Sequence, residues 1–378
     1  MECCLVVQSL AMDTMKSIAV VCGSRKFDGI FLTTKHIIDT LKVFGFSVKA
    51  YQAVDPGHGF SYDTSAVSGI FRGAYFPFVN VEMGFNRLLV YPPRIRMLAE
   101  DEILISDTSM VGSIKDLSRM TVRVQDMRPL SCYRDNYFTT LMFRLVIPRL
   151  RSAKRLIVDT EIVKSQLIER GISGDKIKVV NPVSNIAEDY GAAMRHIESS
   201  VDSIRLHRSI KCLYVATDRP YKNIDFYLKL AKRFSMNSGG SNFIFYLVSK
   251  LRPATQRSIL ELDIPNLIVV DNIESMEAVY SQCDILVFPS LFEGFGIPLV
   301  EAMSRGIPVV TSNIPPMCDI VSTWGLLCKP NDVEDWLEKI LIFSDHGIYS
   351  KYAHLSLQRY ARFDKENFKK SIGEAFND

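Results

Sequence analysis

The stretch from Phe288 to Met303 combines residue types that could bind an anion. Two glycines, Gly294 and Gly296, follow an apolar, strand-like segment, and Pro298 stands where a helix is expected to begin. Glycines let backbone N–H groups approach a ligand closely, and the amino end of a helix adds unpaired donors and partial positive charge. The spacing therefore predicts a backbone cradle for a diphosphate, formed by Gly294, Phe295, Gly296 and Ile297.

Two carboxylates accompany this cradle. Glu293 precedes it, and Glu301 lies in the first turn of the expected helix. Carboxylates accept hydrogen bonds from hydroxyl groups, so a sugar nucleotide would give both residues a function. For Glu301 a simpler explanation stays open, because a carboxylate in the first turn also complements the helix dipole by about 0.3–1 kcal/mol.

The elements that must position these residues alternate along the chain. Short apolar runs are separated by longer stretches of helical periodicity, which is typical of β-α-β units and parallel sheets. In the first half the predicted strands are residues 18–22, 47–51, 103–106, 120–124, 155–158 and 177–180. In the second half they are residues 211–215, 243–248, 267–270, 285–289 and 308–311. The predicted helices include residues 33–44, 161–170, 223–234, 275–282, 298–304 and 332–343.

This alternation restarts after residues 186–208, which are polar and lack a clear strand. We therefore predict an α/β protein with two Rossmann-like, doubly wound domains, residues 1–187 and 188–359, which face each other across a cleft. Ligands of doubly wound folds bind at the carboxyl ends of the strands. The functional residues are consequently expected in the loops that follow strands.

The cradle and its surroundings resemble the retaining glycosyltransferases of family four, which belong to the group 1 glycosyltransferases and have the GT-B fold. Glu293 and Glu301 lie in F-P-S-x-x-E-G-F-G-I-P-x-x-E-A-M, which is similar to the signature of that family. Gly29, before the first predicted helix, resembles the family's glycine turn facing the donor phosphates. Lys222, in P-Y-K-N, resembles the family's phosphate-binding lysine. Residues 360–376 resemble the last helix, which in this family returns to the first domain.

Two positions depart from the pattern of that family. The family usually carries an arginine before the lysine, in the motif V-G-R. This chain has V-A-T instead, ending at Thr217. Arg219, two residues later, could supply the guanidinium group. The family's H-D pair after a strand of the first domain is replaced by Gln125 and Asp126. An amide can hydrogen-bond a sugar hydroxyl but cannot act as a general acid or base. We expect Gln125 and Asp126 to contact the acceptor or the transferred sugar.

The resemblance implies transfer of a sugar from GDP or UDP to a glycan or lipid-linked acceptor, with retention at the anomeric carbon. Lys222 and Arg219, together with the cradle, would take the growing charge of the diphosphate. Glu301 would hold the ribose, and Glu293 would contact the transferred sugar. The chain contains no Asp-x-Asp and no His/Cys/Asp cluster at metal-ligand spacing. We therefore expect a hexosyltransferase that needs neither a metal ion nor a cofactor.

The charge distribution bears on the partners. Residues 1–187 carry 24 Lys and Arg against 18 Asp and Glu, which hints at an anionic partner but is too weakly basic for a nucleic-acid-binding protein. Residues 143–155 hold five basic residues and no acidic one. Such a run could lie on an anionic membrane and present a lipid-linked acceptor. The plainer alternative is an ordinary amphipathic helix, interrupted at Pro148, that packs on the first sheet.

The remaining composition favours the cytoplasm. No apolar run reaches the roughly 18–20 residues of a membrane-spanning helix, and the first fourteen residues lack the features of a signal peptide. The eight cysteines form no C-x-x-C pair, as expected for reduced, mostly buried thiols. We predict a cytoplasmic protein, either free or bound peripherally to the inner face of the membrane.

Three other functions make different demands on the sequence. A nucleotide-sugar epimerase with the same fold would turn over its substrate without an acceptor. A dinucleotide-dependent oxidoreductase would need G-x-G-x-x-G after a strand, and Gly23 and Gly29 are wrongly spaced for it. A non-catalytic subunit that only binds a nucleotide sugar is supported by the departures at Gln125 and Thr217, and it would show binding without turnover.

Overall fold

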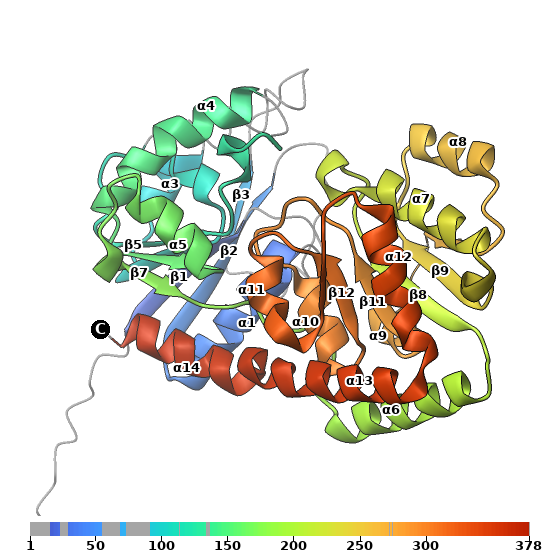
Figure 1. Ribbon diagram of the computed structural model, residues 1–378. Helices are drawn as coiled ribbons and strands as arrows, with labels where there is room; N and C mark the ends of the chain where they lie inside the picture. The colour runs from blue at the N-terminus through green and yellow to red at the C-terminus, as the bar shows by residue number, and fades with distance from the viewer. Residues whose placement is uncertain are drawn as a thin grey trace, which may run out of the picture. The chain divides into compact units, whose positions relative to one another are not determined.

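The computed structural model describes residues 16–22, 29–54, 69–72, 91–112, 114–133, 137–271, 273 and 275–377. A first sheet of seven strands is built from the amino-terminal part of the chain (Figure 1). In spatial order its strands are β3 (Gly69–Arg72), β2 (Ser47–Val54), β1 (Ser17–Cys22), β4 (Glu102–Ile105), β5 (Met120–Val124), β6 (Arg155–Val158) and β7 (Ile177–Val179). The pairs β3–β2, β2–β1, β1–β4 and β4–β5 are parallel.

A second sheet of six parallel strands follows. In spatial order its strands are β10 (Leu267–Val270), β9 (Phe243–Val248), β8 (Ile210–Val215), β11 (Ile285–Phe288), β12 (Val309–Ser312) and β13 (Leu326–Cys328). In both sheets the strand order reverses next to the first strand, at β1–β4 and at β8–β11. This reversal defines the topological switch point of a doubly wound sheet.

Helices connect the strands of both sheets. In the first half they are α1 (Gly29–Val43), α3 (Tyr91–Arg96), α4 (Tyr137–Val146) and α5 (Glu161–Ile168). They continue as α6 (Tyr190–Arg205), α7 (Ile224–Ser235), α8 (Pro253–Leu262), α9 (Met276–Tyr280), α10 (Ile297–Ser304), α11 (Met317–Val321) and α12 (Val333–Leu341). The last two are α13 (His346–Tyr360) and α14 (Lys365–Phe376). None of the described helices is long and apolar enough to cross a membrane.

The core of the second sheet is apolar and aromatic. Strand β11 is fully buried and β8 and β9 bury most of their residues, and α7 and α10 supply further buried side chains. Buried Phe234 contacts the rings of Phe243 and Phe245 at centroid distances of 5.0 and 5.1 Å. Burying such rings contributes roughly 1.5–3 kcal/mol each, which gives the loops at the strand ends a rigid support.

All eleven predicted strands are present within three residues of their expected ends; the largest difference is β2, which extends to Val54 instead of residue 51. The short strands β3 and β13 were not predicted. Residues 186–208, expected only to lack a strand, contain α6, whose buried positions Ala193, Ile197, Ser200 and Ile204 follow helical spacing. By its internal contacts the described chain forms two compact units: residues 1–123 with 145–156 and 376–378, and residues 124–144 with 157–375.

The basic run at residues 143–155 does not form one surface. Helix α4 ends at Val146, a 3-10 turn covers Ile147–Ser152, and β6 begins at Arg155. Arg155 is buried, and its Nη1 lies 2.8 Å from Oε1 of the fully buried Glu102. Lys154 also ion-pairs with Glu102. Arg155 is therefore too buried to meet a membrane surface and Lys154 is paired with Glu102, so the five basic side chains do not share one exposed face.

Candidate functional site

The candidate site lies at the switch point of the second sheet. Strands β8 and β11 are neighbours there, and the loop after each strand begins at its carboxyl end. The loop after β8 carries Arg219 and Lys222, and the loop after β11 carries Glu293 and the two glycines. Residues that are far apart in sequence thus meet at the edge where doubly wound sheets bind ligands.

Glycine is required at the start of α10. Gly296 is the amino-terminal cap of this helix and has φ = +106°, a conformation that side chains rarely adopt. A Cβ at Gly296 would also lie 2.9 Å from Cδ1 of Leu299. Pro298 falls in the first turn, and Gly306 follows the last turn with φ = +67°. The helix is framed at both ends as expected, with its amino end directed at the loop.

Gly294 makes a close approach of a different kind. A Cβ at this position would lie 3.0 Å from the carbonyl oxygen of Gln125 and 3.1 Å from Cβ of Asp126. These residues follow strand β5 and belong to the same compact unit as Gly294. The structure therefore brings Gln125 and Asp126 to the glycine loop. The side-chain carboxylate of Asp126 accepts a hydrogen bond from the backbone N–H of Arg128, at 2.8 Å.

Lys222 and Glu293 form an ion pair at the centre of the site. Nζ of Lys222 donates to both carboxylate oxygens of Glu293, at 2.7 and 2.9 Å. The two side chains are 15% and 10% exposed, so water screens their charges only partly. Nζ also lies 5.6 Å from the ring centroid of Tyr221 and 5.8 Å from that of Phe288. The ammonium is thus held in place by a carboxylate and two aromatic faces.

Hydrogen bonds fix the two loops to each other. The backbone N–H of Leu291 donates to the carbonyl of Tyr221 at 2.7 Å. The amide of Asn223 donates to the carbonyl of Pro289 at 3.1 Å, and Asn223 itself adopts the left-handed conformation at φ = +59°. Buried Tyr214 donates to the carbonyl of Lys222. The backbone around Lys222 is therefore preorganised before a ligand arrives.

Glu301 is buried in α10 but does not lie in its first turn as expected, because the helix begins at Ile297 and its first turn holds no acidic residue. It is 7% exposed, and its carboxylate accepts hydrogen bonds from the hydroxyl of Tyr280 at 2.9 Å and from the amide of Asn185 at 3.3 Å. Burial raises the pKa of Glu301 above its ordinary value, against the effect of these two donors. Tyr280 and Asn185 were not predicted, since neither lies in a motif that could have marked it.

Comparison with known proteins identifies this part of the chain. Residues 198–361 match the family described as "Glycosyl transferases group 1". They form a group 1 glycosyltransferase domain. The protein is accordingly an enzyme, a hexosyltransferase. Arg219, Lys222, Glu293, residues 294–297 and Glu301 all lie within this domain.

Relatives and solved structures extend the match beyond this domain. The chain is 24% identical over 264 residues to "O-antigen chain mannosyltransferase RfbU" of Salmonella typhimurium, covering 68% of this chain and 69% of that protein. It is 44% identical over 61 residues to "O-antigen chain mannosyltransferase B" of Escherichia coli, covering 16% of each. Sucrose-phosphate synthase from Thermosynechococcus elongatus superimposes with a TM-score of 0.75 at 16% identity, over 96% of this chain and 98% of that chain. The predicted GT-B fold is confirmed.

Two further predicted site residues, Arg219 and Gly29, make no hydrogen bond with the side chain of Lys222 or Glu293 among the described contacts. Arg219 is exposed, and its backbone N–H donates to the carbonyl of Thr217 at 2.8 Å. Gly29 begins α1 in the first unit, while the residues before it, 23–28, lie outside the described part of the chain. Within the described residues, no three His, Cys, Asp or Glu side chains gather as a metal ion would require.

Proposed function

We propose that this glycosyltransferase moves a hexose from a nucleoside diphosphate, GDP or UDP, with retention at the anomeric carbon. The observation that carries the proposal is the Lys222–Glu293 pair beside the two loop glycines at the head of α10. A cation, a helix amino terminus and glycine-lined backbone are the groups that stabilise a departing diphosphate. The hexose we propose is mannose, because both sequence relatives reported above are named mannosyltransferases.

Each residue then has a physical task. Lys222 turns from Glu293 to the diphosphate as negative charge develops, and Arg219 adds its exposed guanidinium. Charge-assisted hydrogen bonds of this kind contribute roughly 1.5–3 kcal/mol each. Glu293, released from Lys222, contacts the transferred sugar and stabilises the positive charge on its anomeric carbon. Helix dipole and cations together replace a divalent ion, so we propose catalysis without metal or cofactor.

Glu301 is proposed to hold the ribose hydroxyls of the donor. Its carboxylate is buried against Tyr280 and Asn185, which fixes its orientation. Gln125 and Asp126, next to Gly294, are proposed to contact the acceptor or the transferred sugar. Residues 188–359 would then form the donor domain, and residues 1–187 with the returning segment 360–376 would form the acceptor-side domain.

For the acceptor we propose a glycan or lipid-linked saccharide, in a cytoplasmic enzyme that can bind peripherally to the inner face of the membrane. Arg144 and Arg151 are exposed, as are the apolar Leu141 and Leu145 of α4. These side chains support membrane contact, whereas Lys154 and Arg155 do not. Co-sedimentation with neutral and anionic vesicles at low and high salt tests this, because the attraction of basic side chains decays over about 8–10 Å in physiological salt.

The reaction itself is tested by incubating the enzyme with GDP-hexoses and UDP-hexoses, each with and without a saccharide acceptor. Acceptor-dependent release of nucleoside diphosphate and a product with the donor's anomeric configuration, determined by NMR, are the expected results. Conversion of the donor without acceptor would favour an epimerase. A product of inverted configuration would refute the retaining mechanism while leaving the transfer in place.

A further inference from the structure

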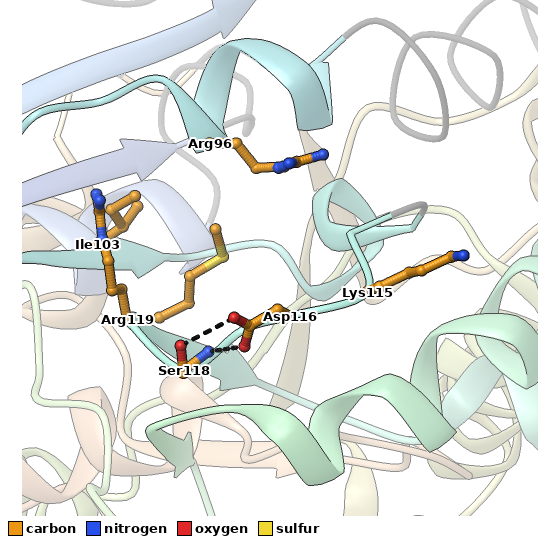
Figure 2. Close-up of a pocket in the computed structure, with 7 residues that line it drawn as sticks. Arg96, Ile103, Lys115, Asp116, Ser118 and Arg119 are labelled. Carbon is orange, nitrogen blue, oxygen red and sulfur yellow. Dashed lines mark hydrogen bonds between the residues drawn. The ribbon is translucent and has the colours of Figure 1, made fainter.

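A second site for an anion is suggested by a cavity in the first compact unit (Figure 2). The cavity has a volume of about 500 Å³. Its floor includes Ile103 and Met120, which lie at the amino ends of strands β4 and β5. The charged and polar lining comes from the end of α3 and from the loop before β5: Arg96, Lys115, Asp116, Ser118 and Arg119.

The lining is positively charged, with three cations against one carboxylate. Asp116 accepts hydrogen bonds from the backbone N–H and the hydroxyl of Ser118, at 2.9 and 3.2 Å. These bonds lower the pKa of Asp116, so its carboxylate is ionised at neutral pH. The cavity therefore carries a net charge of about +2 even with this carboxylate fully counted.

One of the three cations is anchored to the backbone. Nη2 of Arg119 donates to the carbonyl of Leu98 at 2.7 Å and to that of Glu100 at 3.2 Å. This fixes the guanidinium at the rim without neutralising it, because carbonyl groups carry no net charge. No described residue ion-pairs with Arg96 or Lys115, whose side chains extend in the same direction from separate segments in Figure 2.

Three neighbouring cations of the same unit, unlike those of the cavity, share a buried carboxylate. Lys16, Lys154 and Arg155 all ion-pair with the buried carboxylate of Glu102, one residue before Ile103. That group is neutralised in part by the protein itself. Arg96, Lys115 and Arg119 line one hollow in which Asp116 is the only carboxylate among the lining residues, so two of their three positive charges are not balanced there.

We propose that this cavity binds a ligand bearing a phosphate or diphosphate group. Its volume falls within the roughly 300–1,000 Å³ of small-molecule sites. Two guanidinium groups and one ammonium suit phosphate oxygens, which arginine can bind with two parallel hydrogen bonds. The lining lies outside residues 198–361 and at the amino ends of the strands, so this site is separate from the proposed donor site and does not depend on it.

Inorganic pyrophosphate, titrated into the full-length protein by calorimetry, is the test probe. The double variant Arg96→Gln/Lys115→Gln should lose one molar equivalent of binding, or bind at that site at least tenfold more weakly. Arg119 is left intact because it holds two backbone carbonyls. The control Lys35→Gln/Lys42→Gln removes the same charge from exposed positions on α1 and should bind as the wild type does.

Two further comparisons make the result decisive. Lys222→Ala alters only the proposed donor site. This variant should therefore still bind the molar equivalent of pyrophosphate that Arg96→Gln/Lys115→Gln loses. Identical isotherms for the wild type and Arg96→Gln/Lys115→Gln, or an equal loss in the Lys35→Gln/Lys42→Gln control, would overturn the proposal. Circular dichroism verifies that each variant is folded.

Two further binding experiments distinguish a phosphate on a lipid headgroup from a phosphate on a soluble molecule. Vesicles of phosphatidylglycerol present the group on a lipid, and soluble glycerol 3-phosphate presents it free. If the ligand is a headgroup, the wild type should sediment with the vesicles more than Arg96→Gln/Lys115→Gln does, and glycerol 3-phosphate should not compete. If it is a soluble phosphate ester, glycerol 3-phosphate should displace pyrophosphate and vesicle binding should be the same in both proteins.

Discussion

Lys222 and Glu293 are 71 residues apart in sequence, yet Nζ of the lysine lies within 2.9 Å of both carboxylate oxygens of the glutamate. The pair closes the gap between the loops after β8 and β11. Because each side chain is largely buried, removing one partner leaves the other charge without its main counterion. Two residues proposed to act on opposite charges of one substrate thus neutralise each other when no substrate is bound.

The first prediction concerns the energy of this pair. Lys222→Ala and Glu293→Gln should each lower the free energy of unfolding, and the double variant should lose less than the sum of the two. Side chains in direct contact usually show coupling of about 0.5–3 kcal/mol. Urea denaturation of the wild type and three variants measures it. Additive effects would mean that the ion pair contributes nothing to the stability of the site.

A second prediction follows from the burial of Glu301. Burial raises its pKa in the folded state, so its contribution to stability is complete below the unfolded pKa of about 4.3 and is lost as pH rises through the folded value. Glu301→Gln cannot ionise and should not show this loss. Compared with the wild type, the variant should therefore gain stability as the pH rises from about 4.3 to neutral. Unfolding curves whose difference is constant with pH would contradict this.

The close contact of Gly294 makes a third prediction. In Gly294→Ala the new methyl group would meet the Gln125 carbonyl and Cβ of Asp126, neither of which is a flexible side-chain end. Overpacking of this kind costs about 1–3 kcal/mol. Gly174→Ala is a matched control, since its methyl group would meet only the mobile end of Ile168, at 3.2 Å. Thermal unfolding should separate the two, and equal melting temperatures would refute the close approach at Gly294.

Metal independence is the fourth prediction. The proposed site neutralises the diphosphate with Lys222, Arg219 and the amino end of α10, so transfer activity should be unchanged in excess EDTA. Initial rates with and without EDTA, and after adding Mg²⁺ or Mn²⁺, test this. Activity that disappears with EDTA and returns with either ion would show that the diphosphate is neutralised by a metal ion.

Local sequence patterns were enough to predict the strands and the loop at 289–296. Apolar runs of strand length marked β8, β9 and β11 because most of their residues are buried. Helix α6 was missed because its buried face includes small and polar residues, such as Ala193 and Ser200, that do not mark an apolar stripe. Strand β13 has only three residues, too few for a periodic pattern.

Local sequence patterns could not predict which side chains from different loops contact each other. The motifs marked Lys222, Glu293 and Glu301 individually, but nothing in their spacing indicated that Lys222 pairs with Glu293. The Tyr280 hydroxyl that binds Glu301 comes from the end of α9, twenty-one residues earlier. Such contacts depend on which strands become neighbours in the sheet, and that order is fixed by the packing of the whole domain.

The proposed donor site is tested most directly by the affinity of the enzyme for GDP and UDP, measured by calorimetry. The proteins compared are the wild type, Lys222→Ala, Glu301→Ala and the control Lys250→Ala, whose side chain is exposed. Loss of one or two charge-assisted hydrogen bonds predicts that Lys222→Ala and Glu301→Ala each bind the preferred nucleotide about ten- to hundredfold more weakly. The control should bind it as the wild type does. Unchanged affinity in both Lys222→Ala and Glu301→Ala would contradict the donor site proposed at the switch point of the second sheet.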